Sequence, residues 1–310
     1  MFKIFKSTEN GIEQFTDVMY NCWVNVVDPD PDEIARIKEL GIPSDFITYP
    51  LDVDERPRSE REDDGTLLII IRIPVYQGAV SDIPYSTIPL GIVVNDRLIM
   101  TICKQECDVL TDFAAGRAKG LATGKRYRFI LRLLLGVASK YLSYLREINK
   151  MTELVEDQLT SSMKNKEVLE LLKYQKSLVY FTTAIRSNEV LMERLQRMKL
   201  FTQYPEDEDL LEDVITENQQ ALGMIEISNT ILSSMMDAFA SIISNNLNVV
   251  MKFLASITIV LSIPTIVTSY FGMNVPIPGA NGSLAYIGII LLFLVLSIAT
   301  VIIFIKRDWF

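Results

Sequence analysis

The chain has 310 residues, of which 49% are hydrophobic and 22% charged, with a formal net charge of −9 and no histidine. Nucleic-acid binders need a basic surface, so this acidic balance excludes that class. Three cysteines exclude a secreted disulfide scaffold. No charged residue lies between Phe253 and Ile305, and only Lys306, Arg307 and Asp308 are charged beyond them. The sequence therefore predicts an acidic, water-soluble body followed by an apolar C-terminal part, and not a simple soluble enzyme.

Residues 1–120 are predicted to form a mixed α/β domain. Asp30, Pro31 and Glu33 have the spacing of a helix start, as N-cap, N1 proline and the acid of a capping box, and Gly41 is placed to end that helix. Four segments are typical of strands, the last two flanking a turn: residues 22–27, 66–74, 90–94 and 98–103.

Cysteine and glycine positions in this region do not indicate an enzyme or a zinc site. Cys103 and Cys107 are four residues apart with no second pair and no histidine, so we expect buried thiols in a strand and the turn after it. Gly116, Gly120 and Gly124 before Lys125 lack the spacing of a phosphate-binding loop. The sequence carries no nucleophile or cofactor motif either, and predicts a protein that is not an enzyme.

Long helices follow. Residues 121–205 have apolar residues at helical spacing and predict two long antiparallel helices, over about 125–164 and 166–203. Residues 206–271 contain one glycine, Gly223, and one proline, Pro264. They predict a single stalk helix, about 100 Å long at 1.5 Å per residue, that continues into the first membrane span.

The stalk carries a stripe with an average step of 3.5 residues, which is the period of coiled coils and bundles. Its members are Leu211, Ile215, Asn218, Leu222, Ile225, Asn229, Leu232, Met236, Phe239 and Ile243. So long a helix does not hold together by propensity alone and must pack against something. Other copies of the chain are the favoured partner, with the chain's own helices as the alternative.

Two apolar segments are long enough to cross a bilayer, which needs about 20 helical residues. They are residues 253–271 and 284–305, joined by an uncharged loop at 272–283. Lys252 lies before the first, and the basic tail 306–310 follows the second. Basic residues stay on the cytoplasmic side, and the N-terminus lacks the features of a signal peptide. We therefore expect a multi-pass protein of a cell membrane with both termini in the cytosol.

The first span has hydroxyl side chains on one face. Thr258, Ser262, Thr265 and Ser269 step by four, three and four, and the same face extends back to Leu254, Met251 and Asn248. A polar stripe along a lipid-crossing helix is what a pore wall needs. The alternative is that the hydroxyls bond to their own helix or join neighbouring helices.

The span ends in the sequence Tyr270-Phe271-Gly272-Met273-Asn274. This tripeptide after a long stalk helix, in a chain that ends Lys306-Arg307-Asp308-Trp309, resembles the CorA family of divalent-cation transporters. The resemblance covers the whole chain. It implies an α+β cytosolic domain with a long helical stalk and two C-terminal transmembrane helices. It also implies a homopentameric funnel in which the stalk and first span line a central pore.

The resemblance also implies roles for single residues. Gly272, Met273 and Asn274 would form the selectivity mouth. Asn248, Met251 and Leu254 would form the inner constriction, and the pore lining would continue through Thr258, Ser262, Thr265 and Ser269, with Ser262 standing where some relatives have a methionine. A regulatory metal would involve Asp213 on the stalk. The family's partner position is occupied by Tyr49, so Asp45, Asp52 or Asp54 would have to substitute; alternatively, the acidic residues near the stalk's start only favour a helix N-terminus.

The predicted function is passive influx of hydrated Mg²⁺, with Co²⁺ and Ni²⁺ as further candidate cargo, gated by cytosolic Mg²⁺. The predicted partners are copies of the chain, membrane lipid and divalent cations, without nucleic acid. Mg²⁺ is expected both as cargo and as regulator. Two alternatives stay open: a transporter of zinc or another transition metal from the same superfamily, and a membrane-anchored coiled-coil scaffold.

Overall fold

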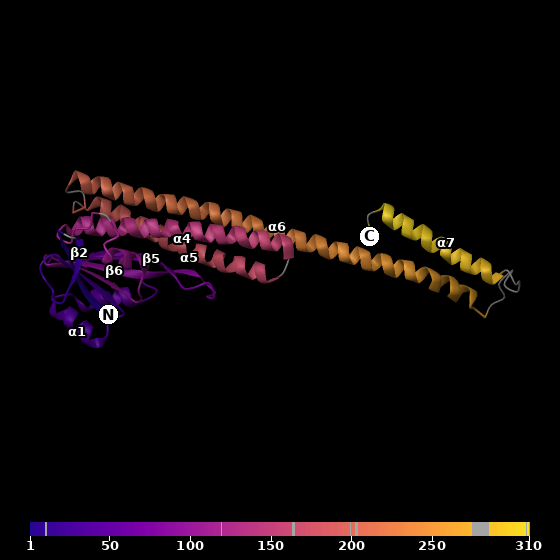
Figure 1. Cartoon of the computed structure of the whole chain (residues 1–310), viewed down its shortest axis with the longest axis horizontal. Coiled ribbons are helices and arrows are strands. Elements are labelled where there is room, and N and C mark those ends of the chain that lie inside the picture. Colours follow the sequence, from indigo (N-terminus) through magenta and orange to yellow (C-terminus); the bar gives the residue numbers. More distant parts are fainter. Residues whose placement is uncertain are drawn as a thin grey trace. The chain divides into compact units, whose positions relative to one another are not determined.

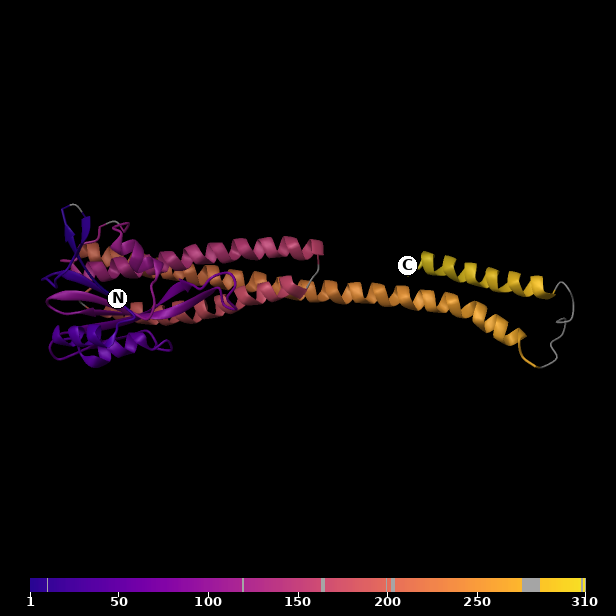
Figure 2. The same ribbon diagram turned by 60° about the horizontal axis from the view of Figure 1, so that its bottom comes forward.

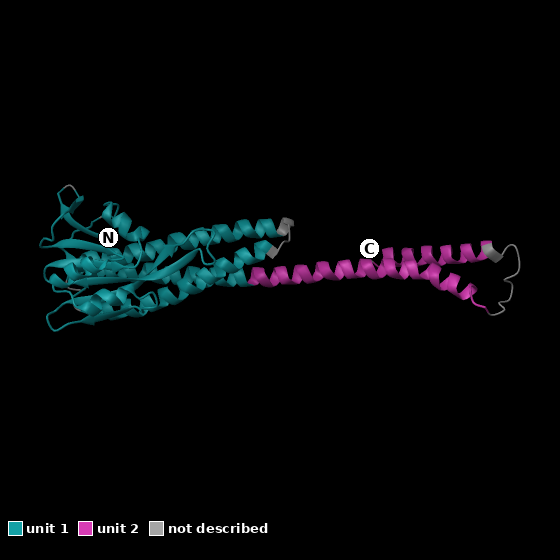
Figure 3. Ribbon diagram, turned by 90° about the horizontal axis from the view of Figure 1, so that it is seen from below, with its two compact units in different colours: residues 1–233 teal, residues 234–310 magenta. Residues whose placement is uncertain are grey.

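The computed structural model describes residues 1–9, 11–118, 120–162, 165–198, 200–201, 204–274, 285–307 and 309. They form two compact units, Met1–Ser233 and Ser234–Phe310 (Figure 3). One helix, α6 (Pro205–Phe271), belongs to both.

Unit 1 is built on one sheet, which has seven strands within the described residues, in the order β2-β1-β3-β7-β6-β5-β4. All neighbours are antiparallel except β3 and β7, which run parallel with Cys22 opposite Leu98 and Val27 opposite Cys103. The strands are β1 (Phe2–Thr8), β2 (Gly11–Phe15), β3 (Cys22–Val27), β4 (Arg58–Arg61), β5 (Leu67–Tyr76), β6 (Tyr85–Val94) and β7 (Leu98–Cys103).

Helices cover both faces of this sheet. Figure 1 shows α1 on one side and α4 and α5 on the other. Among the described residues of unit 1, the helical segments are α1 (Pro31–Glu39), α2 (Ser44–Thr48), the 3-10 turn η1 (Tyr49–Leu51), α3 (Asp108–Ala114), α4 (Arg126–Ser162), α5 (Asn165–Arg197) and the first part of α6. With helices on both faces of the sheet, unit 1 is a three-layer α/β/α body.

Each face of the sheet has its own apolar core. On the α1 face, Ile37, Phe46 and Ile47 pack against strand residues such as Val24 and Met100. On the α4 face the core is centred on Trp23 of β3, which is fully buried among aromatic side chains. Its ring lies 5.3 Å from that of Phe129 in α4, centroid to centroid, and its indole N–H donates to the hydroxyl of Thr101 at 2.9 Å.

The predicted local elements of this body are confirmed where their sequence signal was strong. The hairpin β6–β7, the strand β3 and a strand that includes residues 67–74 are all present. At α1, the Asp30 carboxylate accepts from the N–H of Glu33 at 2.7 Å, and the Glu33 carboxylate accepts from the N–H of Asp30 at 3.2 Å. Gly41 follows the helix with a φ of +84°, a conformation that glycine adopts without strain.

The free edge of β5 is closed by a side chain. Strand β4 pairs with β5 only as far as Ile70. Two residues on, the side-chain amide of Asn188 in α5 accepts from the N–H of Arg72 at 2.9 Å and donates to its C=O at 2.8 Å. The guanidinium of Arg72 donates to the carbonyls of Val53 and Glu55, each at 3.0 Å, and so ties the preceding loop to the sheet.

Helix α6 packs on the other helices of unit 1 through a stripe that differs in part from the predicted one. Its buried members in this unit are Leu211, Val214, Asn218, Ala221, Ile225, Ser228 and Leu232. The step still alternates between three and four, but one predicted row, Ile215, Leu222 and Asn229, is only half-buried. The hydroxyl of Ser228 donates to Asn149 of α4 at 2.7 Å, and Glu226 pairs with Arg186 of α5 at 3.1 Å. The chain's own helices therefore cover part of the stripe. The sequence had favoured other copies of the chain as the packing partner of this stripe.

Candidate functional site

Two described helices are long and apolar enough to cross a membrane, namely α6 and α7 (Ala285–Lys306). They contain the predicted spans at 253–271 and 284–305, apart from residue 284. Of the predicted loop at 272–283, residues 275–283 lie outside the described residues.

Helix α7 covers one face of the last part of α6. The two helices run side by side in Figures 1 to 3. Ser256 is 0% exposed and Val267 is 8% exposed, while Val260 and Ile263 between them are half-buried. Since α7 is the only other described helix of unit 2, these four residues mark the face of α6 that α7 covers.

The predicted hydroxyl stripe lies on the opposite face. At about 100° per residue, Thr258, Ser262 and Thr265 point about 180° away from the face that α7 covers. Thr258, Thr265 and Ser269 are exposed, and Ser262 is half-buried. A shallow groove of about 560 Å³ runs along this face, lined by Thr258, Leu261, Ser262, Thr265 and Ile266. The stripe is therefore left free of the second span.

The hydroxyl hydrogens of this stripe are used inside the helix. Thr258 donates to the carbonyl of Leu254 at 2.8 Å, Ser262 to that of Thr258 at 2.7 Å, and Thr265 to that of Leu261 at 3.3 Å. A hydroxyl that donates its hydrogen still has lone pairs to accept with. The hydroxyls therefore bond to their own helix, as the alternative interpretation of the stripe expected. Their free lone pairs still form a face of oxygen acceptors, which suits a cation or the water around it.

The predicted inner constriction lies on the same helix. Asn248, Met251 and Leu254 are all exposed. At helical spacing, Met251 and Leu254 continue the face of Thr258, and Asn248 lies at its edge.

Pro264 interrupts the hydrogen-bond ladder within the span. It has no N–H for the carbonyl four residues before it, which is a known cause of helix bending. The hydroxyl of Thr268 donates to the carbonyls of Pro264 and Thr265, at 2.9 and 3.2 Å. Figure 2 shows α6 bending in its last part.

The Gly-Met-Asn tripeptide directly follows the last residue of α6. The N–H of Gly272 donates to the carbonyl of Thr268 at 2.9 Å, and the N–H of Met273 reaches that of Tyr270 at 3.5 Å. A Cβ at position 272 would lie 3.1 Å from the carbonyl oxygen of Thr268. Glycine avoids this tight contact and so lets the backbone pass close to the last turn of the helix. Asn274 is exposed. The predicted mouth residues therefore directly follow the helix that carries the hydroxyl stripe.

The candidate residues for a regulatory metal lie on different elements of unit 1. Asp213 is exposed on α6, whereas Asp45 is exposed on α2, on the opposite face of the sheet. Asp52 accepts from the N–H of Asp54 at 3.0 Å, and Asp54 lines a groove of about 480 Å³ beside Tyr180 of α5. Among the described residues, no three acids, cysteines or histidines are grouped to hold a metal ion.

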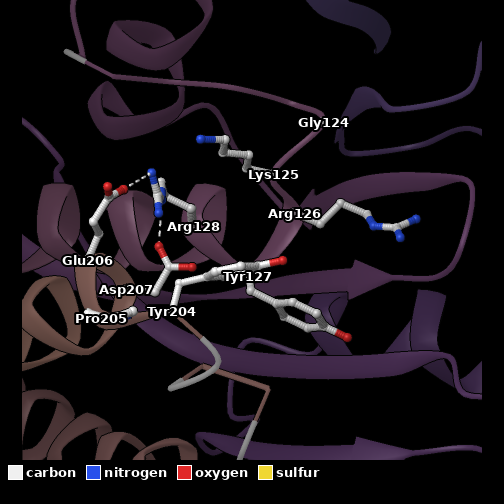
Figure 4. Close-up of a pocket in the computed structure, with 9 residues that line it drawn as sticks. All are labelled: Gly124, Lys125, Arg126, Tyr127, Arg128, Tyr204, Pro205, Glu206 and Asp207. Carbon is white, nitrogen blue, oxygen red and sulfur yellow. Dashed lines mark hydrogen bonds and ion pairs between the residues drawn. The ribbon is translucent and has the colours of Figure 1, made fainter.

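The acidic start of α6 has a structural role that the sequence did not reveal. Arg128 of α4 pairs with Glu206 at 2.8 Å and with Asp207 at 2.5 Å, and the Asp207 side chain is 8% exposed (Figure 4). The pair closes one side of a cavity of about 650 Å³, which is also lined by Gly124 and Lys125. These two acids therefore anchor α6 to α4, beyond any effect on the helix N-terminus.

A family model described as CorA-like Mg²⁺ transporter protein matches residues 19–307. The chain belongs to this family. Its curated relatives include the cobalt/magnesium transport protein CorA of Methanocaldococcus jannaschii, 27% identical over 93% of this chain and 90% of the relative. The protein of the same description from Thermotoga maritima is 22% identical over 99% of this chain and 89% of its own length. The magnesium transport protein CorA of Escherichia coli is 21% identical over 97% and 96%.

Solved structures show the same fold. The complete structure of the CorA magnesium transporter from Methanocaldococcus jannaschii superposes with a TM-score of 0.87 at 23% identity, over 100% of this chain and 99% of that one. Full-length CmaX gives 0.72 at 18% identity, over 99% and 97%. The cytoplasmic domain of ZntB from Vibrio parahaemolyticus gives 0.61 at 14% identity, over 78% and 98%.

These findings confirm the predicted family and fold class, a CorA-type α/β body with a long helix and two C-terminal candidate membrane helices. The chain is accordingly a membrane protein from a family of magnesium and cobalt transporters, and that family is not a class of enzymes.

Proposed function

We propose that this chain forms a homopentameric channel for passive influx of Mg²⁺, with Co²⁺ and Ni²⁺ as further cargo, and that both termini lie in the cytosol. One observation carries the proposal: the hydroxyl face of α6 lies opposite the face that α7 covers. Five copies arranged with α6 inside and α7 outside would line a pore with oxygen acceptors and shield it from lipid.

The membrane potential supplies the driving force. Moving one elementary charge through about 100 mV is worth about 2.3 kcal/mol, so a divalent cation gains about 4.6 kcal/mol on entry. At about 1.4 kcal/mol per decade, this sustains an accumulation on the order of 10³ without ATP.

The mouth would bind the ion with its water shell in place. Mg²⁺ gives up water reluctantly and usually keeps several waters in an octahedral shell. Asn274 and the backbone carbonyl of Gly272 offer neutral oxygens, and residues 272–283 include no carboxylate. The ring of Asn274 amides would therefore accept from the ion's waters instead of replacing them.

Gating would use carboxylates of neighbouring subunits. Within one chain the sheet separates Asp213 from Asp45, so Mg²⁺ could bridge these two carboxylates only from one subunit to the next. Asp52 and Asp54 are the other candidate partners for Asp213 of a neighbouring subunit. At low Mg²⁺ these carboxylates repel one another and the bundle loosens. The constriction at Met251 and Leu254 then wets and the channel conducts.

Flux into proteoliposomes tests the conduction proposal. Purified protein should admit Mg²⁺ to an internal dye at negative potential, and Asn274→Ala should abolish the uptake while native mass spectrometry still gives a pentamer. Asn245→Ala is the matched control. Asn245 is exposed on α6, but it points to the same side of the helix as Ser256, away from the hydroxyl stripe. Absence of uptake by the unmodified chain with Mg²⁺, Co²⁺, Ni²⁺ and Zn²⁺ in turn would contradict a channel and favour the scaffold alternative.

The same assay addresses the zinc alternative. Excess Mg²⁺ should suppress Zn²⁺ entry. Zn²⁺ uptake that persists in excess Mg²⁺ would reassign the cargo.

Limited proteolysis tests the gating proposal. Millimolar Mg²⁺ should slow cleavage of the body in the unmodified protein, and Asp213→Asn should weaken this protection. Asp237→Asn, an exposed acid further along α6, should leave it intact. Equal cleavage with and without Mg²⁺ would rule out carboxylate bridging while leaving conduction unaffected.

A further inference from the structure

A cavity of unit 1 has no part in the proposed transport path. Its volume of about 650 Å³ lies within the range of small-molecule sites, which is about 300–1,000 Å³. Its walls come from the start of α4 and from the residues that lead into α6, and Figure 4 shows their side chains. The lining residues are Gly124, Lys125, Arg126, Tyr127, Arg128, Tyr204, Pro205, Glu206 and Asp207.

Two positive charges on these walls remain free to meet an anion. Arg128 is taken up by Glu206 and Asp207, at 2.8 and 2.5 Å. Lys125 is exposed, and its ammonium has no carboxylate partner within the described part of the chain. The guanidinium of Arg126 donates to a backbone carbonyl of the turn between β6 and β7 at 2.8 Å, which holds it in place without neutralising it. The cavity is therefore cationic in a chain whose net charge is −9.

The sequence around the cavity is basic as well. Residues 117–132 contain six lysines and arginines and no acidic residue. This segment includes Gly120, Gly124 and Lys125, whose spacing does not fit a phosphate-binding loop. The cavity does not need the backbone of such a loop, because Lys125 and Arg126 present cationic side chains. Hydrogen bonds from these groups to a phosphate are charge-assisted and stronger than neutral ones.

Two tyrosine rings line the same cavity. Tyr127 is braced by Phe201, whose ring meets it edge-on at 5.3 Å between centroids. Tyr204 is 57% exposed, so one of its faces is open to a ligand. Aromatic side chains stack on nucleobases, and this stacking tolerates any base because each base has a π face. Free cations beside open aromatic rings suit a ligand that joins a phosphate to an aromatic base.

We propose that this cavity is a binding site for a nucleotide. Lys125 and Arg126 hold the phosphate through charge-assisted hydrogen bonds. Tyr204 stacks on the base, and the ring of Tyr127, fixed by its contact with Phe201, forms the adjoining wall.

Binding would act on the link between α4 and α6. Arg128 of α4 holds two acids of α6, but the side chain of Glu206 is 77% exposed, whereas that of Asp207 is 8% exposed. A phosphate in the cavity can therefore take the place of Glu206 on the guanidinium while Asp207 stays bound. The nucleotide thus loosens one of the two ion pairs that anchor the helix carrying the hydroxyl stripe.

Equilibrium dialysis on the full chain in detergent tests the proposal, with radiolabelled AMP as the probe and a constant concentration of Mg²⁺. AMP should be retained. Its two halves, ribose 5-phosphate and adenosine, should each compete at least about tenfold more weakly than unlabelled AMP, because each lacks one of the two recognised groups. Equal competition by ribose 5-phosphate and AMP would overturn the assignment to a nucleotide, and no retention at millimolar AMP would overturn the site itself.

Two variants place the ligand in the cavity. Lys125→Ala should weaken AMP binding about tenfold, the loss expected for one hydrogen bond to a charged group, and Tyr204→Ala should weaken it about fivefold through lost stacking. Both side chains are exposed, so the melting temperature should not change. The matched controls are Lys176→Ala and Tyr180→Ala, exposed residues of α5 outside the cavity, which should bind AMP as the unmodified chain does. Unchanged binding in Lys125→Ala, or equal losses in variants and controls, would overturn the proposal.

A third variant tests the displacement of Glu206. Glu206→Gln frees one side of Arg128 for the phosphate and should tighten AMP binding, whereas weaker binding would contradict the displacement. These measurements do not depend on ion flux, so their outcome is independent of the proposed transport.

Discussion

The contact between Gly91 of β6 and Pro50 of η1 allows a quantitative prediction about unit 1. A Cβ at position 91 would lie 2.1 Å from Cγ and 2.8 Å from Cβ of Pro50. Carbon atoms in good contact are about 3.5–4.0 Å apart, so the ring must move by about 1.5 Å to admit one methyl group. Pro50 is buried in the segment that leads to Asp52 and Asp54, and a shift there displaces the loop that carries these proposed regulatory acids.

The expected cost follows from that overlap. Overpacking typically destabilises by about 1–3 kcal/mol, and the rigid ring places Gly91→Ala near about 3 kcal/mol. Replacing glycine also restricts the unfolded chain, which offsets about 0.4–1 kcal/mol and leaves about 2 kcal/mol. For a unit of 233 residues, this lowers the melting temperature by about 4–8 °C.

Tryptophan fluorescence on heating measures this change. The chain has two tryptophans. In a Trp309→Phe background, fluorescence reports only Trp23, which is fully buried in unit 1. Gly223→Ala is the matched control, because its Cβ meets nothing within 4 Å on a helix, so its melting temperature should rise slightly. An unchanged or higher melting temperature for Gly91→Ala would refute the reasoning from the overlap.

Three further predictions concern the pore face, a pH-dependent contact and the sheet edge. Thr265→Leu should reduce Mg²⁺ uptake at least about tenfold, since one lost hydrogen bond to a charged group is worth about 1.5–3 kcal/mol. The control is Thr300→Leu on α7, which removes a hydroxyl that also bonds to its own helix, and it should leave uptake unchanged. Equal losses in the two variants would refute a stripe that faces the pore. The pKa of Asp108 is lowered by its lysine and tyrosine partners, so its stabilisation is present above the unfolded value of about 3.9 and is lost as pH falls through the folded value. Asp108→Asn should therefore melt below the unmodified chain at pH 7, and the gap should narrow as the pH falls below about 3.9; a gap of constant size would contradict this. Asn188→Ala leaves the N–H of Arg72 unpaired, while the C=O of Arg72 still accepts from the hydroxyl of Tyr141 at 2.9 Å, and it should cost about 2 kcal/mol in thermal unfolding. Asn188→Asp should keep the bond from the N–H. Full stability of the alanine variant would show that water replaces the amide.

The sequence predicted those elements whose signals are local. The capping box at Asp30 and the hairpin around residues 95–97 need only neighbouring residues, and the two spans need only length and the absence of charge. Strands β1, β2 and β4 were not predicted. β2 and β4 are short edge strands with few buried residues, and β4 reads Arg-Ser-Glu-Arg. Their place in the sheet depends on partners that the local pattern does not reveal.

The candidate site residues and the long-range contacts divide in the same way between local and non-local signals. The hydroxyl face could be predicted because its members lie within one helix at fixed spacing. The ion pair from Arg128 to Asp207 joins residues 79 apart, and the amide of Asn188 meets β5 across 116 residues, so neither had a signal in the sequence. The register of α6 was half right for a similar reason: periodicity fixes the step of a stripe, but the neighbouring helices decide which of two adjacent rows is covered.

The order of elements along the chain bears on how the protein is made. All described strands end by Cys103, the helices that cover the sheet lie within Met1–Ser233, and the first span begins near Phe253. At about 5–20 residues per second, the ribosome needs about 8–30 s to extend the chain from the last strand to that span. Folding of such a body takes place on the order of seconds or faster. The sheet can thus be complete before any hydrophobic span emerges. A folded body of this size resists being drawn through a translocation channel. The timing of synthesis would therefore itself favour insertion with the N-terminal unit left in the cytosol.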